Sequence, residues 1–209
     1  HLFRTKEQLE EKGFELQGNR FVRVAQDADP AEDMPSQNHE VYLPLYEGKM
    51  VHIYNHRWSH SSSDDTTVSE SIALDEPTAE AIPRYWISRE EVSLDNRICS
   101  VLMGFRGIAR TTDERSIIGS LLPVTAVGNS ISVWTSDKDT SSVAHLYGML
   151  VSFVCDFVAR FKLGGTNFNF FIAQQLAVLP PSVFQSSVSP LTTSPSGHLT
   201  TSLIQYLPT

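Results

Sequence analysis

The spacing of apolar residues in the first half of the chain predicts short helices and strands that alternate. Residues 4–13 combine helix-forming side chains with a terminal glycine and predict a short helix, whereas residues 19–25 alternate like a strand. Residues 40–58 are rich in β-branched and aromatic side chains. They predict two short extended segments on either side of a bend at Glu47 and Gly48.

The pattern in the second half predicts a sheet followed by a long helix. Strand-like segments cover residues 99–109, 116–127 and 130–134, and a Gly-Asn turn signal separates the last two. Apolar residues then keep helical spacing from Val143 to Phe161. We therefore expect an α+β fold, in which a mixed or antiparallel sheet of short strands packs with one long, largely buried helix.

Negative charge is concentrated in two segments. The whole chain has a formal net charge of −8, but residues 25–83 hold 12 acidic and two basic residues, a net −10, so the remainder carries +2. Most of these acids lie at 25–40 and 61–82, which are also rich in Pro, Ser and Asp and are predicted to be solvated loops. Nucleic-acid binding depends on a local basic patch and not on the net charge of the chain. The half after Ile98 is mildly basic, so a nucleic acid is still compatible as a partner.

The composition divides the chain into a domain and a tail. We expect one domain over residues 1–183, followed by a Ser/Thr/Pro-rich tail over 184–209 with a weakly helical segment at 199–206. The chain starts with His1, and its first residues contain no apolar signal core. We therefore expect this sequence to be a piece of a longer protein.

The longest apolar run and the cysteines indicate the compartment. The run from 143 to 161 contains His145, Asp156 and Arg160, which a membrane span rarely tolerates, so we predict no transmembrane helix. The chain has only two cysteines, too few for a disulfide framework or a zinc site. This low cysteine count favours a protein of the reducing cytoplasm.

Signatures of catalysis are largely missing from the sequence. It contains no Gly-rich phosphate or dinucleotide loop and no GxSxG elbow. The segment Leu179-Pro-Pro-Ser182 comes nearest to the Asn/Asp-Pro-Pro-Tyr/Phe motif of amino-group DNA methylases. Leu179 cannot accept the hydrogen of the target amine, and Ser182 cannot stack on a flipped base. We therefore expect no catalytic residue and no methyl-transfer centre in this chain.

Two patterns bear on metal chemistry. Histidines recur at intervals of four from His52 to His60, but the segment does not have a helical pattern. Because no cysteine or well-placed carboxylate completes a set of ligands, we predict no bound metal. Glu47 and Lys49 match the Glu-x-Lys half of a metal-dependent nuclease core, whose acidic partner would come from residues 27–33. A nuclease domain is therefore the enzymatic alternative.

Basic and donor-rich side chains gather in two segments of the second half. GFRGIARTTDERS (104–116) holds three arginines, and KLGGTNFN (162–169) combines a lysine, a glycine pair, a threonine and two asparagines. Such groups neutralise phosphates and bond base edges. Arg115, beside Asp113 and Glu114, is alternatively a structural ion-pair partner. The candidate DNA contacts are Lys49, Arg57, Arg106, Arg110, Arg115, Lys162, Thr166, Asn167 and Asn169.

Five blocks of sequence resemble, in order, the C-terminal specificity region of large adenine-N6 DNA methylases. They are HLFRTKEQLEEKGFELQGNRF, YLPLYEGKMVHIYNHRW, PRYWISREEV, GFRGIARTTDERSIIGSLLPVTAVGN and ARFKLGGTNFNFFIAQQLAVLPP. The family comprises the Eco57I-like, type IIG restriction-modification proteins and their relatives in phage-defence systems. The resemblance extends from the start of the chain to about residue 183 and leaves out the acidic loops and the tail.

This resemblance implies a function without catalysis in the fragment itself. In the family, the methylase core and its S-adenosylmethionine site lie upstream, and a TaqI-like α+β target-recognition domain binds the duplex. We therefore predict a sequence-specific recognition domain for double-stranded DNA, with no cofactor of its own, from a bacterial cytoplasmic restriction-modification or phage-defence methyltransferase. Its other partners would be the methylase domain of the same polypeptide and restriction or defence subunits. The remaining alternative is a protein-interaction module whose acidic loops dock a restriction or translocase subunit.

Overall fold

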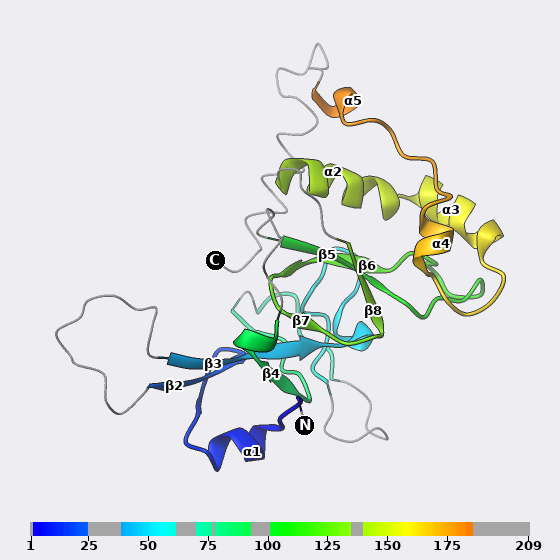
Figure 1. Ribbon diagram of the computed structural model, residues 1–209. Helices are drawn as coiled ribbons and strands as arrows, with labels where there is room; N and C mark the ends of the chain where they lie inside the picture. Colours follow the sequence, from blue (N-terminus) through cyan, green and yellow to red (C-terminus); the bar gives the residue numbers. More distant parts are fainter. Residues whose placement is uncertain are drawn as a thin grey trace.

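The computed structural model describes six stretches of the chain. These are residues 2–24, 39–61, 70–76, 78–92, 101–134 and 140–185. They form an α+β fold that contains two sheets of short strands (Figure 1). The fold class predicted from the sequence is confirmed.

The elements follow one another in mixed order. The strands are β1 (Glu15–Gln17), β2 (Arg20–Val24), β3 (His39–Tyr46), β4 (Trp86–Ser88), β5 (Val101–Arg106), β6 (Gly119–Pro123), β7 (Ala126–Val127) and β8 (Ile131–Trp134). The α-helices are α1 (Lys6–Glu10), α2 (Thr140–Leu150), α3 (Phe153–Lys162), α4 (Phe170–Ala173) and α5 (Ser182–Gln185). Two short 3-10 helices are η1 (Gly48–Met50) and η2 (Arg89–Glu91).

The first sheet joins β1, β2, β3 and β4 in antiparallel order, and β7 runs parallel to the end of β3. Helix α1 begins at Thr5, whose side chain accepts a hydrogen bond from the Gln8 N–H, and the chain turns away at Gly13 with a φ of +79°. Leu9 of α1 packs with Phe21 and other aromatic residues of this sheet. The helix and strand predicted at 4–25 are therefore present.

The second sheet, β6-β5-β8, is buried on both faces. Met103 of β5 faces the helices, whereas the neighbouring Leu102 packs toward the first sheet with Leu122. A Cβ atom added to Gly104 would lie 2.7 Å from Cδ1 of Leu122, so any side chain there would force Leu122 to shift. Figure 1 shows the resulting order of layers: α2 and α3, then the second sheet, then the first sheet, with α1 beyond it.

The predicted long helix is wrong in one respect: it is two helices, α2 and α3, that meet at 63°. Ser152 has extended dihedral angles between them, and its hydroxyl accepts the Cys155 N–H at 3.3 Å, so α3 starts with its own cap. The prediction of a largely buried helix holds for α2 alone, because Phe153 and Phe161 of α3 are 79% and 76% exposed.

Membrane crossing was tested on the described helices. None of them is by itself long and apolar enough to cross a bilayer, and only α2 and α3 taken together, with their bend, reach the required length and composition.

The predicted loop boundaries shift where the structure describes them. His39 and Glu40, placed in the first acidic loop by the sequence, pair with β2 as the start of β3, and the rest of that loop lies outside the described residues. In the second loop, Ile72 and Ala81 are buried beside the sheets, so the prediction of a wholly solvated segment is wrong there. Apolar side chains at those two positions explain the difference, because burial removes them from water.

The extended segment predicted after the Glu47–Gly48 bend is η1 followed by turns up to Trp58. Helix α5 crosses the expected boundary between domain and tail, since Phe184 stacks on His145 of α2 with ring centroids 4.6 Å apart. The weakly helical segment predicted at 199–206 lies outside the described residues.

Candidate DNA interface

Two loops far apart in the sequence are joined by backbone hydrogen bonds. The Ala109 N–H donates to the Thr166 carbonyl at 2.9 Å, and the Phe168 N–H donates to the Gly107 carbonyl at 2.8 Å. The segments 107–115 and 162–169 therefore lie side by side next to α3, where Figure 1 shows them extending beyond the sheet. We call these two segments together the paired loops.

Besides Asn169, four of the predicted DNA contacts are exposed on the paired loops. They are Arg110, Lys162, Thr166 and Asn167. The Arg110 N–H donates to Oδ2 of Asp113 at 3.0 Å, which stabilises the turn that carries the arginine. The loops thus offer a guanidinium, an ammonium, a hydroxyl and an amide within one small surface.

Asn169 has a structural role in the same region. It is the N-cap of α4, and its Oδ1 accepts the Ile172 N–H at 3.1 Å. Its oxygen is already engaged, although the residue is exposed.

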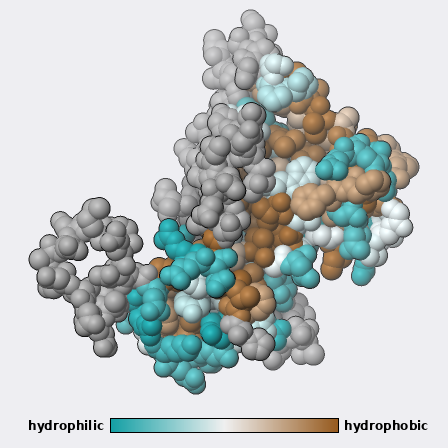
Figure 2. Space-filling view, in the orientation of Figure 1, coloured by the Kyte–Doolittle hydropathy of each residue, from teal (hydrophilic) through white to brown (hydrophobic). Residues whose placement is uncertain are grey.

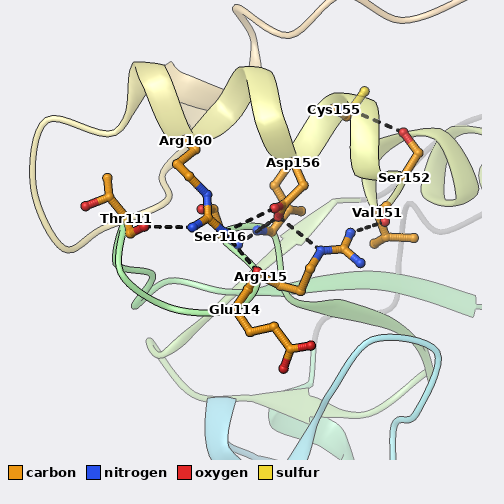
Figure 3. Close-up of polar contacts among 10 residues, drawn as sticks. Thr111, Glu114, Arg115, Ser116, Val151, Ser152, Cys155, Asp156 and Arg160 are labelled. Carbon is orange, nitrogen blue, oxygen red and sulfur yellow. Dashed lines mark hydrogen bonds and ion pairs between the residues drawn. The ribbon is translucent and has the colours of Figure 1, made fainter.

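Arg115 is the last residue of the first of the paired loops, and its side chain binds inside the protein. Only 14% of this side chain is exposed, and its Nε lies 3.4 Å from Oδ1 of Asp156 (Figure 3). Its guanidinium lies 4.6 Å from the centre of the Phe153 ring. A second guanidinium nitrogen donates to the Val151 carbonyl. The structure therefore places Arg115 in the structural ion-pair role, with Asp156 as its partner rather than the adjacent acids Asp113 and Glu114.

Asp156 is the centre of this buried network. Its Oδ1 accepts the backbone N–H groups of Ser116 and Ile117, both at 2.7 Å, and its Oδ2 lies 3.5 Å from Arg160. Arg160 in turn donates to the carbonyls of Thr111 and Glu114, at 2.8 and 2.9 Å (Figure 3). Because the buried carboxylate is paired and hydrogen-bonded, it ties α3 to the loop that carries Arg110.

Two other predicted contacts hold loops together. Arg106 is half-buried, its Nε donates to the Val51 carbonyl at 2.8 Å, and burial lowers the pKa of its guanidinium. Arg57 donates to the carbonyls of Glu76 and Ala79 and so fixes the described part of the second acidic loop. Both side chains are engaged by backbone oxygens.

Lys49 and Glu47, the candidate nuclease pair, form an ion pair of 3.6 Å, and Glu47 also accepts the hydroxyl of Ser61. Among the described residues, no group of three His, Cys, Asp or Glu side chains is placed to hold a metal ion. The acidic partner expected from residues 27–33 lies outside the described residues.

The three regularly spaced histidines have separate environments. His52 stacks near Trp58 with ring centroids 4.5 Å apart, and Nδ1 of His60 accepts the Ile82 N–H at 3.1 Å. Burial, with a smaller contribution from the nearby Arg57 charge, lowers the pKa of His56 to about 4. The segment is not helical, as its sequence pattern indicates.

Sequence reasoning missed the loop around Tyr54. This residue has a φ of +60°, which non-glycine residues rarely adopt, and its side chain is 58% exposed. The Tyr54 N–H donates at 2.8 Å to the hydroxyl of Tyr147, which itself donates at 2.9 Å to the Gly119 carbonyl. No local pattern signals this arrangement, because the buried tyrosine that supports it comes 93 residues later.

Comparisons of this chain with models of known protein families, with curated proteins and with solved structures find no significant match.

Proposed function

We propose that this chain is a sequence-specific recognition domain for double-stranded DNA from a restriction-modification or phage-defence adenine-N6 methyltransferase, and that it has no catalytic centre of its own. The observation that carries the proposal is the pairing of segments 107–115 and 162–169 through backbone hydrogen bonds. These segments belong to two of the five blocks that resemble the methylase specificity region, and they are thereby neighbours. Their exposed groups suit phosphates and base edges.

The four exposed residues divide into two chemical tasks. Arg110 and Lys162 carry positive charge in a chain of net charge −8, and we assign them to phosphate neutralisation. Thr166 and Asn167 are short donor-acceptor side chains, and we assign Asn167 to a base edge, where an amide can bond adenine bidentately. The backbone bonds beneath both loops hold these groups in place before DNA binds, which lowers the entropic cost of recognition.

Arg57, Arg106, Arg115 and Asn169 take a supporting role in this proposal. Their polar groups already bind carbonyls, a carboxylate or a helix terminus. Replacing them would disturb the loops and weaken binding indirectly.

The test measures DNA binding by fluorescence anisotropy across a salt series. The chain first selects a preferred duplex from a random pool, and an unrelated duplex of equal length serves for comparison. Arg110→Ala and Lys162→Ala should weaken binding to both duplexes and reduce the salt slope by about one unit each. Asn167→Ala should cost about 1–3 kcal/mol on the selected duplex only.

Lys6→Ala is the matched control, because this lysine is half-exposed on α1, on the far side of the molecule from the paired loops (Figure 1). It should change neither the slope nor the preference. Equal binding by all three loop variants and the wild-type chain would refute the assignment of this surface. Calorimetric binding of S-adenosylmethionine would refute the non-catalytic reading independently of any DNA result.

A further inference from the structure

Helix α3 buries a charged residue and exposes most of its large apolar residues. Its inner face consists of the buried residues Cys155, Asp156 and Ala159. Its outer face is apolar, and its residues, with their exposed fractions, are Phe153 (79%), Val154 (75%), Phe157 (64%), Val158 (40%) and Phe161 (76%). These positions follow i, i+1, i+4, i+5 and i+8, which places them on one side of a helix. We call them the outer face of α3.

The outer face of α3 is as large as the largest apolar patches that single soluble domains expose. Three largely exposed phenylalanines and two valines present on the order of 600 Å² of apolar surface, at the upper end of what single soluble domains leave open. Figure 2 shows apolar colour gathered over the helical part of the molecule, whereas the surface around α1 is mainly hydrophilic. The size of this surface calls for a covering element.

We propose that segment 199–207 of this same chain covers the outer face of α3. Residues 186–209 lie outside the described structure and contain no Asp, Glu, Lys or Arg. Within them, Leu199, Leu203, Tyr206 and Leu207 recur at i, i+4, i+7 and i+8, which puts four large side chains on one side of a helix. An uncharged amphipathic helix matches an uncharged apolar face.

The connection is long enough for this contact. Helix α5 ends at Gln185, and Phe184 anchors it to His145 of α2, the helix that precedes α3. Residues 186–198 then provide 13 residues of Ser/Pro-rich chain, which span up to about 43 Å when extended, whereas a ten-residue helix such as α3 is about 15 Å long. The linker is therefore longer than the outer face that the segment would cover.

Tethering also decides between this segment and a second copy of the chain. A segment tethered by a linker of this length has an effective concentration of up to millimolar, well above micromolar protein in solution. The tethered segment therefore occupies the outer face first, unless its own contact is much weaker than that between two copies.

The test is hydroxyl-radical footprinting of the full chain, read by mass spectrometry at single residues. Oxidation of Phe157 and Phe161 is normalised to that of the urea-unfolded chain, with Tyr54, which is 58% exposed elsewhere, as internal reference. In the wild-type chain both phenylalanines should be several-fold better protected than Tyr54. Leu203→Asp/Leu207→Asp should remove that protection, because it places two charges in the contact.

Thr201→Asp/Gln205→Asp is the matched control, since it adds the same charges on the opposite side of the predicted helix and should leave the protection unchanged. Sedimentation of each variant at several concentrations gives its mass. Two results would overturn the proposal: phenylalanines as reactive as Tyr54 in the wild-type chain, or protection that survives Leu203→Asp/Leu207→Asp and rises with dimer formation. The second result would assign the outer face to another copy of the chain.

Discussion

Helices α2 and α3 come from one continuous apolar run, yet they use it in opposite ways. α2 places Tyr147 and Leu150 in the core, and both are almost completely buried. α3 turns its phenylalanines outward and rests on Asp156 and Ala159 instead. Helical spacing thus decides which side chains share a face, while the bend between the helices decides where that face points.

The groups against which each helix packs explain this difference. Behind α2 lie Met103, Phe105 and Leu121 of the second sheet, an apolar surface that large side chains fill. Behind α3 lie the backbone N–H groups of Ser116 and Ile117, whose hydrogen-bond acceptor is the side chain of Asp156. An unpaired buried N–H costs about 1–3 kcal/mol, so a carboxylate, not a phenylalanine, belongs at this position.

The largest effect should come from Asp156→Ala. This change leaves Arg115 without its buried partner and leaves two backbone N–H groups without an acceptor, which should lower the free energy of unfolding by about 3–5 kcal/mol. Urea denaturation followed by tryptophan fluorescence measures the loss. Asp113→Ala removes a carboxylate from the same loop near the surface and should cost less than about 1 kcal/mol. Equal costs for the two variants would contradict the central role of Asp156.

Next comes Leu150→Ala, which tests the large inward side chains of α2. Leu150 is 1% exposed, and its truncation should cost about 3 kcal/mol, because it removes buried surface and leaves a cavity. Leu74→Ala is the control at a position 74% exposed and should stay within about 0.5 kcal/mol of the wild type. The same urea experiment compares both. A small loss for Leu150→Ala would mean that α2 is not firmly packed on the sheet.

Ala159→Leu tests the opposite requirement in α3. Ala159 is fully buried where α3 packs closely, so a larger side chain should destabilise the protein by about 1–3 kcal/mol through overpacking. Val178→Leu adds one methylene group at a position 48% exposed and outside the outer face of α3, and it should leave the unfolding free energy within about 0.5 kcal/mol. Stabilisation by Ala159→Leu would show that space remains behind α3.

The last effect is absent at neutral pH and concerns the loop that Tyr147 of α2 supports. The pKa of His56 in this loop is about 4, below the ordinary value of 6.5, so the unfolded chain binds a proton that the folded chain does not. The stabilisation is complete above pH 6.5 and is lost at about 1 kcal/mol per pH unit as the pH falls from 6.5 toward 4.

His56→Gln should remove this component. Urea midpoints of the wild type and the variant, compared at several pH values from 7.5 to about 4.5, should diverge toward low pH, with the variant less sensitive to acid. Parallel pH dependence of the two proteins would mean that His56 protonates equally well in the folded and unfolded states.

Part of the candidate interface was predictable from local sequence. The two donor-rich segments, 104–116 and 162–169, stand out by composition, and the structure places them side by side. Which members remain exposed was not predictable, because it depends on distant partners. Arg115 binds Asp156, 41 positions later, and Arg106 binds the carbonyl of Val51, 55 positions earlier.

The sequence by itself determined the α+β class and the strands whose residues are alternately apolar and polar or continuously apolar. It also determined the helix ends that local caps specify, such as those at Thr5 and Gly13. These features depend on neighbouring residues, whose propensities and hydrogen bonds act within a few positions. Ser152 caps α3 through a residue only three positions away, but the tertiary structure decided that α3 turns its apolar side chains outward. That outcome depends on which buried donors need an acceptor once the sheet has formed, and this demand arises only when distant segments meet.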